Sequence, residues 1–508
     1  MAFVTVAVVA ALAATASPAA EADAVRGWVR AHEGAIVHEL ADLVRLPNLA
    51  RDTTAIRANA DRLVAMLGRR GMEARLLEVE GSPPAVYGVR RVPGARRTLV
   101  FYAHYDGQPV DPSKWHGDPW TPVLRDRALE EGGQEIPLAE GPYPAEARLY
   151  GRSSSDDKGP IVALLAALDA LRAIGREPSV NVALFLEGEE EAGSAHLERM
   201  LQAHRDVLAA DAWLFCDGPV HQSRRMQLYF GARGVTDLEL TLYGPARALH
   251  SGHYGNWAPN PAVEMAHLVA SLRDRDGRIQ IAGYYDDVRP PSETERQALR
   301  EVPDADDALR AELALGRTEA GGARLVERIL LPALNVRGLV AGAVGAQAAN
   351  AIPTDARASV DFRLVPDQTP EGVRAKVEAH LRAQGYQIVH DAPSLDQRRA
   401  QPRLVRLDWG AGYPAARTSM DLPVSRALVR VVSERAGAPV IRLPTLGGSV
   451  GMEVFTRVLG RPVVGLPIVN HDNNQHAADE NLRLQNLWDG IEVFAAVMMR
   501  LGELWDAP

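Results

Sequence analysis

An apolar run that ends in a cluster of acids constrains this fold more than any other part of the sequence. Residues 180–186 are apolar apart from one asparagine, and residues 187–191 read Glu-Gly-Glu-Glu-Glu. The run predicts a buried strand, and the leucine spacing after it predicts a helix over residues 195–208 that is capped by Ser194. Carboxylates crowded at a strand end repel one another unless a cation or a shared proton offsets their charge. Because open α/β sheets bind ligands at this end, we expect a ligand site here; the alternative is a solvated acidic loop.

The composition narrows the class of protein. A chain of 508 residues can bury a large core and is expected to form more than one domain. The formal charge of -9 is spread along the chain, and no basic stripe with interleaved aromatic residues occurs, which argues against nucleic acid as a partner. The single cysteine, Cys216, excludes an intramolecular disulfide and a cysteine-rich metal site. We expect it to be a small buried side chain.

The N-terminus has the pattern of an export signal. Residues 3–14 are almost wholly apolar, and residues 13–20 are small enough for a signal peptidase, so we expect residues 1–22 to direct a periplasmic or secreted protein. No Lys or Arg precedes the run, although such signals usually carry one. The alternatives are an ordinary N-terminal helix or a misassigned start in a cytoplasmic protein. No later segment is long enough to span a membrane, so we expect no membrane partner.

The order of predicted elements indicates two domains. Strands and helices alternate in residues 23–230 and again in 413–508, which predicts a mostly parallel α/β sheet covered by helices on both faces. Residues 231–412 differ, because their strands alternate polar and apolar side chains, as half-exposed antiparallel strands do. We therefore expect an α+β domain inserted into an α/β domain. Its main elements are strands at 236–243 and 359–364 and helices at 262–273 and 370–384.

Five groups of acids and histidines share one position, just past the end of a predicted strand. The carboxyl ends of parallel strands meet on one rim of a sheet, so these loops can converge on a single cleft. Imidazole and carboxylate ligands without thiolates suit zinc, or else manganese or cobalt, and their number suffices for two ions with one bridging carboxylate. Taken singly, each residue is more often a cap, turn or core residue. The groups are His104 with Asp106, Asp156 with Asp157, Glu190 with Glu191, Asp217, and residues 470–476 with His476.

Three of these groups lie in motifs that resemble a known enzyme family. YAHYDGQP (102–109), GRSSSDDKGP (151–160) and EGEEEAGS (187–194) resemble the signature blocks of the carnosinase, aminoacylase and carboxypeptidase G family of co-catalytic metallopeptidases. The resemblance covers nearly the whole mature chain, including LHSG (249–252) and His476 with Glu480 after it. The long insertion and YYDDV (284–288) resemble the dipeptidase branch in particular.

The resemblance implies a role for each residue of the constellation. His104 and Asp217 would hold one metal ion, Glu191 and His476 the other, and Asp156 would bridge the pair. Two divalent ions per subunit are implied, with zinc first and manganese or cobalt as alternatives.

Two acids would act around those ligands. Asp106 would orient the imidazole of His104. Glu190 would be the general base that takes a proton from water and returns it to the leaving amine. A shift of one residue in the register would make Glu189 the base instead, and Gly193-Ser194 favours Glu190.

Further residues are implied in substrate binding and assembly. The inserted domain would mediate a homodimer, and His250 would reach the partner subunit's active site to stabilise the oxyanion; the alternative for His250 is a structural loop residue. Arg363 would bind the substrate carboxylate, because a guanidinium fork suits that group. Asn350 and Ser449 are further substrate-contact candidates.

These expectations predict a metal-dependent hydrolase that cleaves the amide bond of dipeptides or short peptides with a free C-terminal carboxylate. An N-acyl amino acid hydrolase or a glutamate-releasing carboxypeptidase would share the metal site and differ in pocket shape. GGSVG (447–451) also matches the Gly-x-Ser-x-Gly turn of serine hydrolases, with Ser449 as nucleophile, but that interpretation leaves the metal-ligand constellation unexplained. A binding module that has lost its metals would lack a ligand or the base, and none is lacking here.

Overall fold

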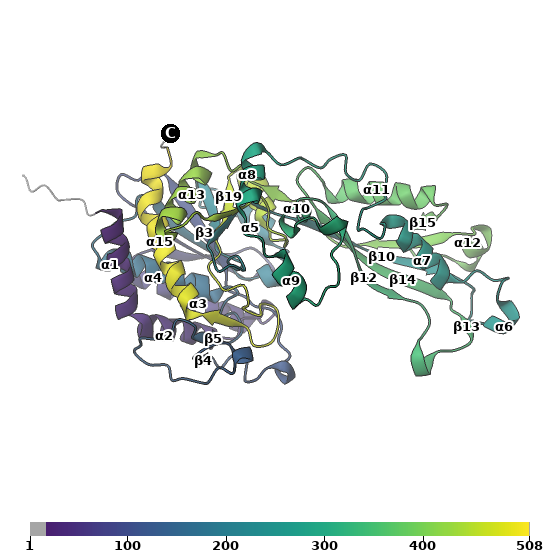
Figure 1. Cartoon of the computed structure of the whole chain (residues 1–508), viewed down its shortest axis with the longest axis horizontal. Helices are drawn as coiled ribbons and strands as arrows, with labels where there is room; N and C mark the ends of the chain where they lie inside the picture. Colours follow the sequence, from purple (N-terminus) through teal and green to yellow (C-terminus); the bar gives the residue numbers. More distant parts are fainter. Residues whose placement is uncertain (1–16, 507–508) are drawn as a thin grey trace, which may run out of the picture.

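The protein has two lobes joined end to end (Figure 1). The structure, a computed structural model, describes residues 17–506. The apolar run of the predicted export signal lies outside this range. Helix α1 (Pro18–Ala31) begins within the last residues assigned to that signal, and its Val25 and Val29 are buried in the core. Within the described range, no helix has the length and apolar character needed to cross a membrane.

The larger lobe is built on a mixed sheet whose centre is parallel. Strands β6, β3, β7 and β19 run parallel to one another, whereas β1, β2 and β8 pair antiparallel with a neighbour, and β18 runs parallel to β8. Within residues 17–506 the spatial order is β1 (Glu73–Leu77), β2 (Ala85–Arg90), β6 (Asn181–Glu187), β3 (Thr98–His104), β7 (Ala212–Phe215), β19 (Val463–Gly465), β8 (Gln227–Tyr229) and β18 (Ile441–Leu443).

Helices cover both faces of this sheet. Successive apolar side chains of a central strand point to opposite faces, so both faces must be buried. On β3, Phe101 belongs to the core under one set of helices, and Val100 and Tyr102 belong to the core on the opposite face. The first set is α1, α2 (Glu33–Val44), α3 (Thr53–Arg69), α4 (Lys158–Ala173), α13 (Pro423–Ala436) and α15 (Leu484–Leu504). The opposite face is covered by α5 (Leu197–Ala203) and α14 (Met452–Leu459). The predicted α/β class is confirmed.

The helix predicted after the acidic cluster is shorter than its leucine pattern indicated. The chain forms a 3-10 turn over Glu190–Ala192, and Gly193 and Ser194 then adopt positive φ values of 90° and 52°. Helix α5 begins only at Leu197, after His196, and no side chain caps it. The predicted Ser194 cap is therefore wrong, because the left-handed turn precedes the helix.

The smaller lobe is a second sheet flanked by helices. It is mixed, because β15 pairs parallel with β16 at one edge, whereas the other strands are antiparallel as predicted. The described strands, in spatial order, are β12 (Ala333–Val340), β14 (Asp355–Leu364), β10 (Gly234–Tyr243), β16 (Leu404–Trp409) and β15 (Gln387–Val389). Helices α7 (Pro261–Leu272) and α11 (Pro370–Ala383) bury Met265, Leu268, Val373 and Val377 in the core of this lobe.

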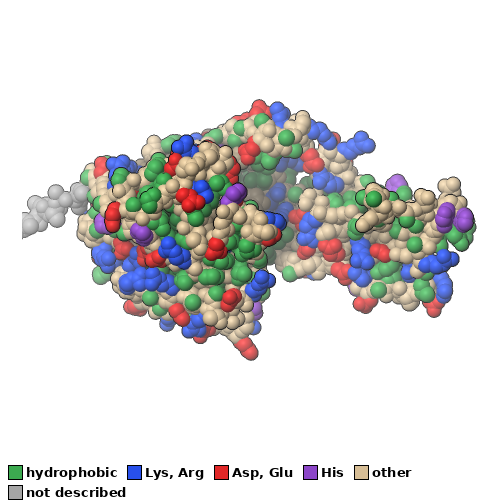
Figure 2. Space-filling model, turned by 90° about the horizontal axis from the view of Figure 1, so that it is seen from below, with side chains coloured by type: hydrophobic (Ala, Val, Ile, Leu, Met, Phe, Trp, Pro, Cys, Tyr) green, Lys and Arg blue, Asp and Glu red, His purple; other side chains and the backbone are tan. Residues whose placement is uncertain are grey.

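Short elements complete the two lobes. At the far end of the smaller lobe, β11 (Leu249–His250) pairs with β13 (Ala351–Ile352) beside α6 (Ser251–Tyr254) (Figure 1). Between residues 293 and 400 the chain also forms the short helices α8 (Glu293–Glu301), α9 (Asp306–Glu312), α10 (Leu325–Arg328) and α12 (Leu395–Ala400). The surface is hollowed between the lobes (Figure 2). The domain limits at 231 and 412 stay predictions.

Candidate metal centre

The four central parallel strands bring acids and two histidines to one rim. Strand β3 ends at His104, and β6 leads into the turn that carries Glu190 and Glu191. Asp217 follows β7, and the segment after β19 leads to His476. Because these strands run parallel, their carboxyl ends lie on the same side of the sheet.

Asp156 reaches this rim by another route. The strand before it, β5 (Arg148–Tyr150), belongs to a separate small sheet with β4 (Val123–Arg125) and β20 (Asn481–Arg483). The prediction that Asp156 follows a strand of the main sheet is therefore wrong. Its loop leads directly into α4, and its position depends on contacts outside the main sheet.

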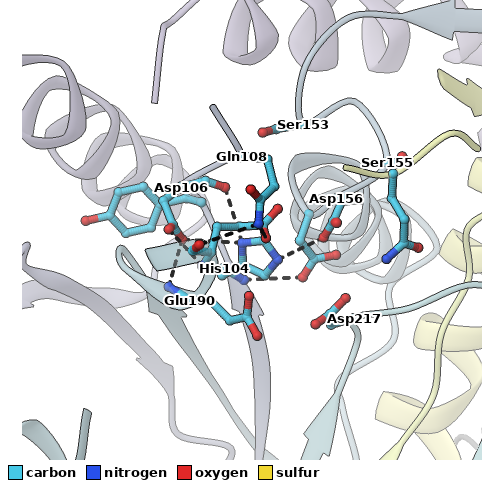
Figure 3. Close-up of polar contacts among 12 residues, drawn as sticks. His104, Asp106, Gln108, Ser153, Ser155, Asp156, Glu190 and Asp217 are labelled. Atoms are coloured by element: carbon cyan, nitrogen blue, oxygen red, sulfur yellow. Dashed lines mark hydrogen bonds and ion pairs between the residues drawn. The ribbon is translucent and has the colours of Figure 1, made fainter. Parts of the chain in front are cut away.

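Side chains from separate segments meet at Asp156. Nε2 of His104 lies 2.9 Å from Oδ1 of Asp156 (Figure 3). Nε2 of His476 lies 3.2 Å from Oδ2 of Asp156 and 3.2 Å from Oε2 of Glu191. Asp217 is also buried, with 7% of its surface exposed, and it lies near enough to Asp156, His104 and His476 for their charges to shift its pKa (Figure 3). Tertiary packing thus brings together all five residues predicted as metal ligands.

Asp106 organises the turn that carries the two adjacent glutamates. Its Oδ1 accepts a hydrogen bond from the backbone N–H of Glu190 at 3.1 Å, and its Oδ2 accepts one from that of Glu191 at 3.0 Å. Oδ1 also lies 3.4 Å from Nδ1 of His104. One fully buried carboxylate therefore holds a histidine and the acidic turn in register.

The backbone at Asp217 is held by its neighbours in the sheet. The hydroxyl of Tyr229 donates a hydrogen bond to the carbonyl oxygen of Asp217 at 2.9 Å. A side chain at Gly465 would overlap the Tyr229 ring, so the absence of a Cβ there leaves room for this contact.

Burial makes the clustered acids hard to ionise. It raises the pKa of Glu190 well above the ordinary range, and the carboxylates of Asp217 and Glu191 add to the shift. Burial, followed by the charge of Asp156, raises the pKa of Glu191 to about 8 and that of Asp217 to about 6. A nearby divalent cation would reverse these shifts, because it favours the charged form of each carboxyl group.

The residues fit metal ions on the chemistry of their donor atoms. Oδ2 of Asp156 is buried, and Nε2 of His476 lies 3.2 Å from it. Burial opposes the charge on Asp156, but its contacts with His104 and His476 outweigh burial and hold the pKa of Asp156 well below its ordinary range. One donor atom each from His104, Asp156 and Glu191 lies within 4.8 Å of the others. Imidazole nitrogens with an ionised carboxylate are the donors that zinc, manganese and cobalt accept.

Glu189 and Glu190 differ in their surroundings. The Glu189 carboxylate accepts a hydrogen bond from the backbone N–H of His196 at 2.6 Å and lies 2.9 Å from its Nδ1. Glu190 instead lies near His104 and Asp217, whose charges act on its titration (Figure 3). If Glu189 were the base, as in the alternative register, the base would be a carboxylate that is already bound to His196 at the start of helix α5.

Arg363 and Ser449 lie together at the junction of the lobes. Arg363 belongs to β14, and its Nη1 donates a hydrogen bond to Oγ of Ser449 at 2.8 Å. Burial, and then the Glu190 carboxylate, raise the pKa of Tyr413 to about 12, whereas Arg363 opposes that shift. The Tyr413 phenol is thus within electrostatic reach of both Glu190 and Arg363.

His250 and Asn350 are not near this cluster in the same chain. His250 lies at the end of β11, and its Nδ1 accepts a hydrogen bond from the N–H of Gly252 at 3.1 Å. The carbonyl oxygen of Asn350 accepts a hydrogen bond from the N–H of Ser251 at 2.9 Å. Both residues are exposed and sit beside α6 at the far end of the smaller lobe (Figure 1).

Ser449 also lacks the surroundings of a serine nucleophile. Its Oγ contacts Arg363 and, at 3.5 Å, the carbonyl oxygen of Gly234. Within the described part of the chain, no hydrogen bond joins Ser449 to a histidine or a carboxylate, which a serine nucleophile requires. The serine hydrolase alternative is not favoured.

Two residues of the site were given no role from the sequence. Nε2 of Gln108 donates a hydrogen bond to Oε2 of Glu191 at 2.7 Å, and Glu480 is fully buried under the loop that carries Asp156. Both lie in or beside motifs that showed the family resemblance. Their position in those motifs was a signal, but only the folded chain shows which residues they contact.

The sequence matches a known protein family. Residues 100–500 match the model of the peptidase family M20/M25/M40. The Cys-Gly metallodipeptidase of Schizosaccharomyces pombe is 25% identical over 492 residues, which cover 92% of this chain and 96% of that protein. The human Beta-Ala-His dipeptidase is 24% identical over 440 residues, with 83% and 78% covered.

Solved structures show the same fold. An M20 family metallo-carboxypeptidase from Sulfolobus solfataricus is 27% identical, with a TM-score of 0.75 and coverage of 92% of this chain and 99% of the other. Human carnosine dipeptidase 1 is 21% identical, with a TM-score of 0.73 and coverage of 95% and 99%. The predicted family resemblance is confirmed by these matches.

Proposed function

Because the chain belongs to peptidase family M20/M25/M40, we propose that it is a metal-dependent dipeptidase acting on substrates with a free C-terminal carboxylate. Relatives named as Cys-Gly and Beta-Ala-His dipeptidases match it over most of their own length. The observation that carries the proposal is the position of His476 Nε2, which lies 3.2 Å from both Asp156 and Glu191. A histidine between two buried acids from separate segments is an arrangement suited to a divalent ion.

The five rim residues would hold two ions. We assign His104 and Asp217 to one ion, Glu191 and His476 to the other, and Asp156 to both. Zinc is the first choice, with manganese or cobalt as alternatives, because the donors are imidazole and carboxylate without thiolate. When bound, such ions supply Lewis-acid activation of water and of the amide carbonyl.

Glu190 carries the proton in this proposal. It accepts a proton from the attacking water and gives it to the amide nitrogen as the C–N bond breaks, so that a carboxylic acid and an amine are formed. Asp106 keeps Glu190 in place through the backbone bond at 3.1 Å. A carboxylate suits both halves of this task, since it can bind the proton and then release it.

Arg363 and Ser449 are proposed to bind the substrate carboxylate. Arg363 lies on the smaller lobe and Ser449 on the larger lobe, so a substrate bound by both would be held at the junction. A guanidinium can bind a carboxylate through two parallel hydrogen bonds. Asn350 and His250 would act on the substrate of the partner subunit, because they lie far from the metal cluster of their own chain.

The smaller lobe is the proposed dimer interface. Edge strand β12 and the segment after it expose Leu339, Val340 and Val344, whose exposed fractions are 55%, 59% and 88%. An exposed apolar edge strand favours pairing with another chain. Sedimentation analysis of Val340→Asp tests this, because a monomeric variant is expected and an unchanged dimer would contradict the assignment.

Export of the chain is proposed from residues 1–22. The apolar composition of residues 3–14 supports it. N-terminal sequencing of protein expressed in its source cells is expected to show loss of the first residues, and a retained Met1 would contradict export.

A substrate panel after metal removal tests the proposed activity. Chelator treatment is expected to abolish cleavage of dipeptides, and added zinc, manganese or cobalt should restore it. The panel includes acyl amino acids, folyl-type glutamates and longer peptides, because an acylase or a carboxypeptidase would prefer those. Full activity in the presence of chelator would overturn the proposal.

A further inference from the structure

The roles assigned so far leave out one buried carboxylate of the rim. Glu480 is fully buried, four residues after His476 and directly before β20. Within residues 17–506, every hydrogen bond to its carboxylate comes from the loop that carries Asp156. Oε1 accepts bonds from Ser155 N (3.0 Å), Ser155 Oγ (2.8 Å) and Asp156 N (2.9 Å), and Oε2 accepts bonds from Arg152 Nη1 (2.8 Å) and Ser153 N (2.9 Å).

The chemistry of these donors requires a carboxylate at this position. The N–H groups of Ser153, Ser155 and Asp156 belong to buried residues and would each be costly to leave unpaired. A carboxylate offers two acceptor oxygens with about four lone-pair sites, and the five donors occupy both oxygens fully. An amide of the same shape would point its NH₂ group at some of the donors.

The contacts also run from the Asp156 loop back to the His476 loop. The carbonyl oxygen of Glu480 accepts a hydrogen bond from Gly151 N at 3.0 Å. Nη2 of Arg152 donates one to the carbonyl oxygen of Ala477 at 3.0 Å. Ala477 is adjacent to His476, so the loops that carry two of the proposed metal ligands are tied together from both sides.

These contacts hold the Asp156 loop at the rim, because within residues 17–506 the main sheet has no strand that leads to Asp156. The other four proposed ligands follow central parallel strands, but the strand before Asp156 belongs to the small sheet. In that sheet, Asn481 pairs with Tyr150, and the Glu480 contacts extend the same pairing toward the rim. The position of Asp156 relative to His476 is therefore set beside β20 rather than by the main sheet.

We propose that Glu480 is a positioning residue that fixes Asp156 and His476 relative to each other, so that both present donor atoms to the same ion. The inference rests on the proposed metal centre. Glu480 would act on metal affinity through its hydrogen bonds, without touching ion or substrate. Residues that orient metal ligands in this way typically change affinity about 10- to 100-fold when they are replaced.

Zinc titration of full-length protein stripped with a chelator tests the proposal. Glu480→Gln is expected to weaken zinc binding by about 10- to 100-fold. At saturating zinc the KM for a dipeptide should stay within about two-fold of the wild-type value, because Glu480 does not contact Arg363 or Ser449. Glu492→Gln is the matched control. Glu492 is also buried and ion-paired, to Arg26 and Arg435, but it lies within α15, so zinc affinity should be unchanged.

Folded Glu480→Gln protein with wild-type zinc affinity would overturn the proposal. If that variant does not fold, Ser155→Ala decides the question, because it removes one hydroxyl donor and leaves the Glu480 charge intact. Its zinc affinity should fall by about 2- to 10-fold, the effect of one hydrogen bond, and unchanged affinity would overturn the proposal as well. A wild-type chain that binds no divalent ion would instead refute the metal centre on which this inference rests.

Discussion

Nη1 of Arg363 donates a hydrogen bond to Oγ of Ser449 at 2.8 Å, across 86 residues of sequence and across the junction of the two lobes. Nε of Arg363 also donates to Oδ2 of Asp361 at 3.0 Å, which orients the guanidinium along β14. The proposed carboxylate site therefore exists only where the two sheets meet.

Replacement of Arg363 by Met should raise the KM for dipeptides about 10- to 100-fold, because a charged hydrogen bond to the carboxylate is lost. Steady-state kinetics on a dipeptide and on its C-terminal amide would check this, since the amide has no carboxylate to lose. Arg357→Met is the control, an exposed arginine on the same strand. An equal loss on both substrates would argue against carboxylate recognition by Arg363.

Replacement of Glu190 by Gln should lower kcat by about 10²- to 10⁴-fold, because the proton acceptor is removed. Zinc content measured by mass spectrometry should stay the same as in the wild type. Glu189→Gln is the matched control, since that carboxylate is bound to His196 and turnover should persist. The reverse pattern, with Glu189 essential and Glu190 dispensable, would assign the base to Glu189.

Loss of the His250 imidazole should disable the site of the partner subunit rather than its own. His250→Ala and Glu190→Gln homodimers are each expected to have little activity. In a statistical mixture of the two variants, about one quarter of the wild-type rate should return, because half of the dimers contain one intact site. No recovery in mixed dimers that are verified by mass would show that His250 acts elsewhere.

The metal-free protein should lose stability as the pH rises from about 4 to 8. Asp217 and Glu191 have pKa values of about 6 and about 8 in the folded chain, above their values in an unfolded chain. Burial opposes protonation of His104, but hydrogen bonds to Asp106 and Asp156 outweigh it and raise its pKa well above the ordinary value.

All three groups bind protons more tightly when folded, so their stabilisation is complete at low pH and is lost as each deprotonates. Asp156 has the opposite shift, so its stabilising effect is complete across this range and is lost only when the pH falls below about 4. Urea unfolding at pH 5 and pH 8, with chelator and with zinc, would measure this. Zinc should remove most of the loss at pH 8, and a metal-free protein more stable at pH 8 than at pH 5 would contradict the assignment.

Periodicity and motif order predicted much of the architecture. The apolar runs before His104, Glu187 and Asp217 indicated buried parallel strands, and those strands lie side by side in the sheet as β3, β6 and β7. Buried strands have this local signature because both of their faces must be apolar. The family resemblance followed from short motifs whose order along the chain survives without any knowledge of contacts.

Local pattern misled where non-local contacts decide. The leucines after Ser194 indicated a long helix, but the left-handed turn at Gly193 and Ser194 delays it to Leu197. The edge strand β15 pairs parallel with β16, although each short strand alone carries no sign of direction. Strand direction and register depend on the partner strand, which lies elsewhere in the sequence.

The sequence by itself determined the chemical inventory of this protein: its buried strands, its class, and the acids and imidazoles that can hold metal ions. These properties are local, since they depend on which residues are present and on their spacing. Only the tertiary structure decided how the inventory is assembled. Asp156 reaches the rim from a small separate sheet and is held there by Glu480, and Arg363 meets Ser449 between the lobes. Hydrogen bonds act over about 3 Å, so which buried groups satisfy one another is settled only when distant segments pack together.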